Sequence, residues 1–462
     1  MTKDMTAGSP ARLILLFALP LIAGNIFQQL YGFVDTLLVG RLLGVEALAA
    51  VGSTGGLMFL SVGFVMGFSA GLSICTGQRF GAKDEAGVRR SAAACFFLSF
   101  AAGIVLLAVS LLLLDTFLTV LNTPADIYDD ARAFIQVIFA GIPILMVFTM
   151  TQNLIRALGD SKHPTIILST GLVVNIIVEM IFLLVFGWGV VGAAAAILVA
   201  QFAAILHGQY YIYRHFPMLR VRLSDFRLDR RIIMEHLKIG LPMGFQSTLI
   251  AIGALFMQWA LNGLGPVAVA SYAASMKVDA IAMMPMMSFG MAMATYTAQN
   301  YGAQRFDRIV SGVRQCICIS VGFAVVTGLL NALFGKDLIA VFVAGDAHAL
   351  EVIDYGQTYL VIQGSCYWVL ALLFIYRYTL QGLGYTFAPT FAGVMELVMR
   401  GVAAFFLVQA FQFVGASWAS PLAWIGSCVP LLIAYYRVER LLLKRAEREE
   451  RLARRRSDAG AE

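Results

Sequence analysis

The chain has 462 residues, of which 60% are hydrophobic and 13% are charged. A soluble domain carries about 25% charged residues, so this composition excludes a soluble globule and predicts a membrane protein that crosses the bilayer several times. The net charge of +6 is interpreted as the charge asymmetry of membrane loops rather than as a nucleic-acid-binding surface.

Long apolar runs recur along the whole chain, which predicts transmembrane helices rather than a β-barrel. We therefore expect an all-α fold with about twelve spans in two groups of six. In chain order the expected spans are 13–39, 46–77, 88–114, 131–156, 164–186, 190–212, 233–261, 267–298, 309–334, 351–381, 388–411 and 415–436.

The first expected span contains Asp35, the only charge between Arg12 and Arg41. A lone charge in hydrocarbon costs at least ~2.5–3.5 kcal/mol, so its presence needs a compensating function. Gln28 and Tyr31 lie on the same helical face as Asp35 and are candidate supporting residues.

The span at 46–77 contains glycines at residues 63, 67 and 71, a spacing that is typical of close helix packing. The span at 164–186 contains a second acid, Glu179, with Asn175 one turn earlier on the same face. The arginines and lysines of the first six spans lie at the span ends rather than in their interiors. Asp35 and Glu179 are therefore candidate proton- or small-cation-binding residues if they converge. The alternative is that each acid separately satisfies hydrogen bonds between helices.

Arginine and lysine gather in alternate loops, at 79–90, 156–162, 214–231 and 305–314, and in the C-terminal tail. This pattern predicts that both termini are cytoplasmic. The basic tail, 441–462, is interpreted as a solvated anchor or as a contact with anionic lipid headgroups.

Two motifs repeat at a distance of about half the chain. "GQRFGAKD" (77–84) returns as "AQNYGAQR" (298–305), and "RALGDSKHPT" (156–165) returns as "QGLGYTFAPT" (381–390). Pro20 and Pro242 also occupy matching places, and each should bend its helix. Six spans per copy put both copies in the same orientation, which is typical of a transporter with two lobes, here 1–225 and 226–440.

The second half carries acids and bases inside its expected spans, namely Lys277, Asp279, Arg377, Glu396 and Arg400. Glu396 and Arg400 are four residues apart and can pair on one face, so this set is interpreted as structural. Methionines of the span at 267–298 are candidate cavity residues, since methionine adapts to varied ligands, although packing in the core is the alternative. The candidate substrate-cavity residues are Met283, Met287, Gln246 and Phe33.

The six cysteines form no CxxC pair and the five histidines form no HExxH motif. We therefore expect no enzyme activity, no cofactor and no structural metal.

The repeated motifs at 77–84 and 298–305 and at 156–165 and 381–390, together with "QQLYGFVDTLLVG" in the first span, carry a resemblance to a known family. Over residues 10–440 the chain resembles the multidrug and toxic compound extrusion (MATE) antiporters. The resemblance implies a V-shaped cavity between two six-helix lobes and export of drugs driven by inward H⁺ or Na⁺ flow. It is similar to the bacterial branch with its cation site in the N-terminal lobe, whose acid on the first span and Asn-x-x-x-Asp motif map onto Asp35, Asn175 and position 179. Pro20 matches the bent first span of that branch.

Two departures from this branch bear on the coupling ion. Position 179 is Glu rather than Asp, and Ile197 stands where the family has a hydroxyl ligand. Hard metal cations need several oxygen ligands, whereas a proton needs one carboxylate, so H⁺ is favoured over Na⁺.

The sequence therefore predicts a multi-pass exporter of amphipathic, often cationic compounds in a bacterial cytoplasmic membrane. The alternative within the same wider superfamily is a flippase for a lipid-linked sugar, which would place arginines such as Arg377 and Arg400 on the cavity. A passive channel is disfavoured because the repeat indicates alternating access.

Overall fold

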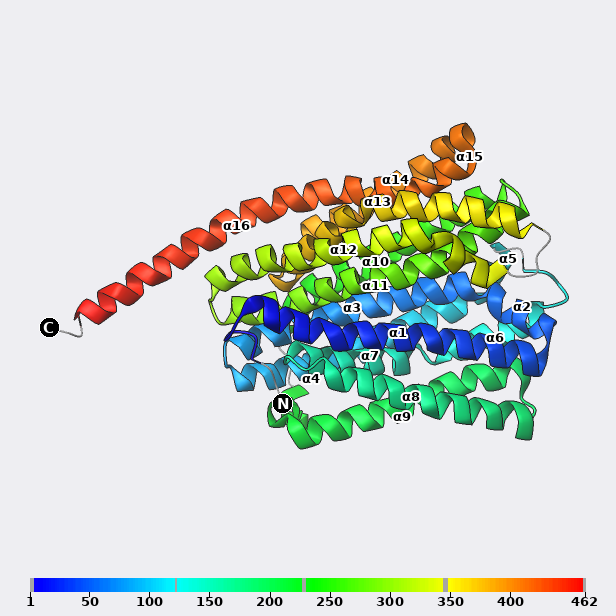
Figure 1. Ribbon diagram of the computed structural model, residues 1–462. Helices are drawn as coiled ribbons and strands as arrows, with labels where there is room; N and C mark the ends of the chain where they lie inside the picture. Colours follow the sequence, from blue (N-terminus) through cyan, green and yellow to red (C-terminus); the bar gives the residue numbers. More distant parts are fainter. Residues whose placement is uncertain (1–3, 121–122, 227–229, 344–347, 460–462) are drawn as a thin grey trace. The chain divides into compact units, whose positions relative to one another are not determined.

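The structure is a computed structural model that describes every residue except 1–3, 121–122, 227–229, 344–347 and 460–462 (Figure 1). The described residues are almost entirely helical and contain no β-strand. This follows from the composition, because a helix satisfies its own backbone hydrogen bonds where lipid offers no partner.

The chain divides into two compact units. The first unit comprises Pro20–Phe80 and Asp84–Thr248, and the second comprises Asp4–Leu19, Gly81–Lys83 and Leu249–Glu462. Helices α1 (Pro10–Leu43) and α10 (Arg230–Asn262) each contribute residues to both units.

The other helices of the first unit follow one another with short connections. They are α2 (Val45–Ser53), α3 (Gly55–Gly81), α4 (Glu85–Leu112), α5 (Leu114–Val120), α6 (Tyr128–Ala140), α7 (Ile142–Ala157), α8 (Lys162–Met180), a π-helical turn η1 (Ile181–Val185), α9 (Gly189–His215) and the 3-10 turns η2 (Pro217–Leu219) and η3 (Leu223–Phe226).

The second unit has fewer and longer helices. They are α11 (Pro266–Gly302), α12 (Phe306–Val343), α13 (Ala349–Gly382), α14 (Phe387–Val402), a π-helical turn η4 (Ala403–Leu407), α15 (Val408–Ser417) and α16 (Ala419–Ala459). The last helix carries the basic tail, whose side chains from residue 449 onward lie outside the described part.

Eleven helical segments of the described chain are long and apolar enough to cross a bilayer, and α6 with α7 makes twelve when this bent pair counts as one span. The predicted all-α fold with about twelve spans is therefore confirmed. The expected span at 131–156 is bent by 47° between Ala140 and Ile142, where Gly141 meets the first turn of a helix with Pro143 near its start.

The expected helix at 46–77 is wrong in one respect, because the structure ends α2 at Ser53 and starts α3 at Gly55. The hydroxyl of Thr54 donates to the carbonyl of Val51 at 2.7 Å and thereby closes the end of α2. Two glycines directly after Thr54 weaken continuation of the helix.

The two halves share backbone features as well as motifs. Gly44 and Gly265, each just before a helix, have φ angles of 91° and 93°. Lys83 and Gln304, in the paired motifs at 77–84 and 298–305, have φ angles of 59° and 58°. Such left-handed residues at matching positions, together with π-helical turns after α8 and after α14, support the parallel repeat.

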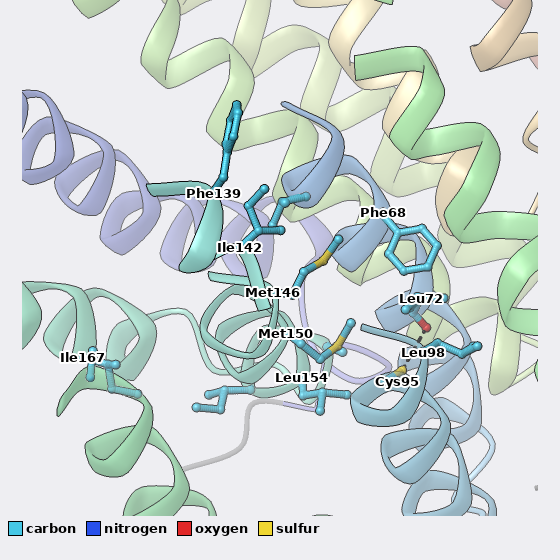
Figure 2. Packing of buried hydrophobic residues seen from close by; sticks show 14 of the residues in the cluster. Phe68, Leu72, Cys95, Leu98, Phe139, Ile142, Met146, Met150, Leu154 and Ile167 are labelled. Carbon is cyan, nitrogen blue, oxygen red and sulfur yellow. Dashed lines mark hydrogen bonds between the residues drawn. The ribbon is translucent and has the colours of Figure 1, made fainter. Parts of the chain in front are cut away.

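The core of the first unit gathers α3, α4 and α7 (Figure 2). Met146, Met150 and Leu154 recur along one side of α7 and are fully buried. The thiol of Cys95 on α4 donates a hydrogen bond to the backbone carbonyl of Leu72 on α3, with 3.4 Å between sulfur and oxygen. All six cysteines have free thiols.

The glycine spacing in α3 permits a close approach of α10 within the first unit. A Cβ atom at Gly67 would lie 2.4 Å from the carbonyl oxygen of Met243, and one at Gly71 would lie 2.8 Å from the Cα of Gly240. The interpretation of this stripe as close packing is therefore supported by the geometry.

We predict that Gly67→Ala destabilises the protein, because the backbone of α10 cannot move away as a flexible side chain would. Overpacking of this kind costs about 1–3 kcal/mol. The midpoint of thermal unfolding of the purified protein in detergent measures it. Gly322→Ala on α12 is the matched control, since nothing lies within 4 Å of the added Cβ; equal midpoints for the two variants would contradict the prediction.

Candidate functional site

Two acids of the first unit meet between α1 and α8. The carboxyl groups of Asp35 and Glu179 lie within hydrogen-bonding reach of each other. Glu179 is fully buried, while Asp35 is partly exposed. Oδ1 of Asp35 and Oε1 of Glu179 are buried without a hydrogen-bond partner, and no base acts on either acid within the described part of the chain.

Asn175 lies one turn before Glu179 on α8 and is also buried. In the orientation that satisfies its amide, the nitrogen donates to Oε2 of Glu179 at 3.3 Å and the oxygen accepts the backbone N–H of Ile197 at 3.2 Å. The amide oxygen is thus engaged by α9, and Asn175 presents a donor to the acid pair.

The third wall of this site is α9, where the sequence has no hydroxyl at position 197. Ile197 contributes only a backbone donor there. One turn later, Gln201 has a buried side-chain oxygen without a hydrogen-bond partner. Sequence reasoning missed Gln201, although its spacing of four residues from Ile197 places it on the same side of the helix.

The three candidate supporting residues on α1 differ in their placement. The carbonyl of Pro20 accepts the hydroxyl of Thr165 on α8 at 2.8 Å, which joins the proline turn to the helix that carries Glu179. Gln28 is exposed, and the side chain of Tyr31 lies outside the described residues.

The candidate cavity residues belong to different units. Phe33 on α1 is 61% exposed and Gln246 on α10 is buried, and both lie in the first unit. Met283 and Met287, one turn apart and partly buried on α11, lie in the second.

Three of the five charged residues that were singled out above inside the spans of the second half form a buried cluster in the second unit. Glu396 accepts a hydrogen bond from Arg377 at 2.8 Å and another from Arg400 at 3.1 Å. The side chains of the two arginines are only 7% and 14% exposed. Lys277 is exposed, with its ammonium 5.4 Å from the ring centre of Phe342.

The flippase alternative is not favoured by this arrangement, because the arginines that it would place on a cavity are buried against an acid. The fifth charge, Asp279, is also buried, but it contacts tyrosine hydroxyls instead of a base. Among the described residues no group of three or more His, Cys, Asp or Glu side chains could hold a metal ion.

A twelve-span helical bundle with a repeated half and an acid pair inside its spans defines a multi-pass membrane transporter. The chain matches the MatE family over residues 20–181 and 242–406 and belongs to that family. Members of this family are transporters rather than enzymes, and in general they are ion-coupled antiporters without cofactors.

Two relatives come from Bacillus subtilis. The chain is 27% identical to the probable multidrug resistance protein YpnP, over 77% of this chain and 79% of the relative. It is 25% identical to the probable multidrug resistance protein YoeA, over 94% and 95%. A crystal structure of a MATE protein in complex with MaL6 has the same fold, with a TM-score of 0.88 at 21% identity over 96% of this chain and all of that chain.

We predict that Glu396→Gln strongly destabilises the protein, because it leaves two buried guanidinium groups without their counter-charge. Breaking a buried pair in this way costs about 3–5 kcal/mol. Thermal unfolding in detergent measures the loss, with Lys277→Gln, which removes an exposed charge, as the control. If both variants unfold at the wild-type temperature, the cluster has no structural role.

Proposed function

We propose that the chain is a proton-coupled antiporter that exports amphipathic, often cationic drugs and toxic compounds across a bacterial cytoplasmic membrane. The observation that carries this proposal is the contact between the Asp35 and Glu179 carboxyl groups without a neighbouring base. The names of the Bacillus relatives, both probable multidrug resistance proteins, support the substrate class.

A proton fits the acid pair better than Na⁺ does. Two carboxyl groups form a hydrogen bond with each other only if one of them carries a proton. Asn175 offers an N–H rather than an oxygen to Glu179, and Ile197 offers a backbone N–H. A sodium ion would need these groups to present oxygen atoms instead.

The proposed cycle uses the lobes 1–225 and 226–440 in alternating access. Protons from outside bind Asp35 and Glu179, the protonated lobe favours release of the drug, and loss of the proton to the cytoplasm resets the transporter. We place Gln246, Met283, Met287 and Phe33 on the drug cavity, since flexible methionines and an aromatic ring suit varied apolar shapes.

The proposed orientation puts both termini in the cytoplasm, because the basic loops and the basic tail alternate along the chain with loops that carry few arginines and lysines. The tail beyond residue 440 would then face the inner leaflet, where its arginines attract anionic lipid headgroups. No nucleic-acid partner is proposed.

We predict that Asp35→Asn and Glu179→Gln abolish dye efflux that is driven by a pH gradient, because neither amide binds the coupling proton. The measurement is efflux of a fluorescent lipophilic cation from proteoliposomes under an imposed ΔpH, and separately under an imposed Na⁺ gradient. We expect the wild type to respond to ΔpH alone.

Thr36→Val is the matched control beside Asp35, because it removes a polar group that bonds only the backbone of its own helix. It should transport at the wild-type rate. Undiminished ΔpH-driven efflux in Asp35→Asn would refute the proposal. Efflux that only a Na⁺ gradient drives would identify Na⁺ as the coupling ion.

We predict that Gln201→Leu lowers ΔpH-driven efflux about two- to fivefold, because it removes a buried polar oxygen one turn from Ile197, whose backbone N–H holds Asn175. The polar group is expected to be worth about one hydrogen bond. Initial efflux rates at several pH values measure the effect. Gln28→Leu is the control, since Gln28 is an exposed amide. Equal rates in both variants would place Gln201 outside the site.

A further inference from the structure

The second unit contains a buried acid with neutral partners. Asp279 on α11 is 2% exposed. The hydroxyl of Tyr367 donates to its Oδ1, and the hydroxyl of Tyr359 donates to its Oδ2 at 3.3 Å. Asn331 on α12 in turn donates to the hydroxyl oxygen of Tyr367 at 3.0 Å. Three helices therefore converge on one carboxyl group.

The charged and titratable groups around Asp279 leave it without an ion pair in the described part of the chain. Besides the two tyrosines of α13, Arg400 on α14 acts on it only at a distance and is paired with Glu396 at 3.1 Å. On its own helix, Tyr272 is the other titratable neighbour, and Lys277 is exposed.

The tyrosine face of α13 also carries an unused acceptor. Gln363 lies one turn from Tyr359 and one turn from Tyr367, so the three side chains leave the helix on the same side. Gln363 is fully buried; its nitrogen donates to the carbonyl of Ser417 at 2.9 Å, while its oxygen has no hydrogen-bond partner among the described residues. A buried acceptor without a donor is an unusual cost in an apolar interior.

These contacts suit two protonation states of one carboxyl group. As a carboxylate, Asp279 accepts both hydroxyl hydrogens, as observed. As a carboxylic acid, it donates its hydrogen to a tyrosine oxygen, and the displaced hydroxyl hydrogen needs another acceptor. The thioether sulfur of Met276 lies 3.3 Å from the Tyr359 hydroxyl and can accept that hydrogen. Gln363 carries a further acceptor on the same face of α13.

We propose that Asp279 is a second proton-binding site, located in the second unit and separate from the Asp35–Glu179 pair. Its place in the transport cycle rests on the proposed function: Asp279 takes a proton from one aqueous side and returns it to the other. A proton rather than a metal ion is the ligand, because one carboxylate with hydroxyl donors lacks the several oxygen ligands that a hard cation needs.

The direct test is infrared difference spectroscopy of the purified full-length protein in lipid, titrated between about pH 5 and 9. A protonated carboxylic acid has a carbonyl band that a carboxylate lacks. We expect one titrating band that Asp279→Asn removes and that the double variant Asp35→Asn, Glu179→Gln retains. Tyr367→Phe should keep this band but shift its frequency, because one hydrogen-bond partner is lost.

Three results would overturn the inference: no titrating carboxylic band in this pH range in the double variant, a titrating band that survives when Asp279→Asn is added to the double variant, or a band of the double variant that added NaCl removes at constant pH. If Asp279→Asn does not fold, the frequency shift in Tyr367→Phe decides, and an unshifted spectrum counts against the site. Failure of the proposed function would have a different result from failure of this inference. If the proposed function is wrong, ΔpH-driven efflux stays intact in the double variant, and the carboxylic band of Asp279 is unaffected.

Coupling through Asp279 has its own readout. In proteoliposomes, net flux stops at a particular ratio of the dye concentrations on the two sides of the membrane. If one coupling proton per cycle is lost, this ratio is about tenfold lower for each unit of ΔpH. We expect this fall in Asp279→Asn, whereas Tyr359→Phe, which keeps the carboxyl group, should retain the wild-type ratio at a lower rate. An unchanged ratio in Asp279→Asn would show that no coupling proton passes through this residue.

Discussion

Hydrocarbon offers no hydrogen-bond partner to a polar group, and this constraint governs where each charge of the chain is placed. Asp35 and Glu179 satisfy it through each other and through Asn175, which in turn is held by the backbone of α9. The arrangement is incomplete, because one oxygen of each acid lacks a donor. In the proposed function a mobile proton completes it, so the same feature that makes the pair costly to bury would make it responsive to the aqueous phases.

The two units meet this constraint in different ways. In the second unit Glu396 lies between Arg377 and Arg400, where fixed positive charges keep it compensated at all times. Fixed compensation favours a rigid packing element, since removal of any member leaves an unpaired buried charge. Among the described residues of the first unit no such base lies beside Asp35 and Glu179, and Asp279 shows that the second unit contains one acid of this kind as well.

The sequence predicted the spans well because hydropathy over about 20 residues is a strong signal. It failed where the backbone is locally interrupted, as between Ser53 and Gly55, since such a break leaves the apolar run intact. Asp35, Asn175 and Glu179 could be selected because a charge in an apolar run is conspicuous. Gln201 and the tyrosines around Asp279 could not, because polar residues at the bilayer centre acquire meaning only from partners on other helices.

The π-helical turns η1 and η4 also bear on the history of the chain. Each follows the helix that begins with a repeated "PT" motif, and each contains one more residue per turn than the helix around it. An inserted residue shared by both halves is most simply inherited from one ancestral half that existed before duplication. The charged residues of these helices differ between the halves, since α8 carries Glu179 just before η1, whereas α14 carries Glu396 and Arg400 before η4. The backbone irregularity is therefore common to both halves while the charges beside it are not, so helices of the same shape carry different arrangements of charge in the two halves.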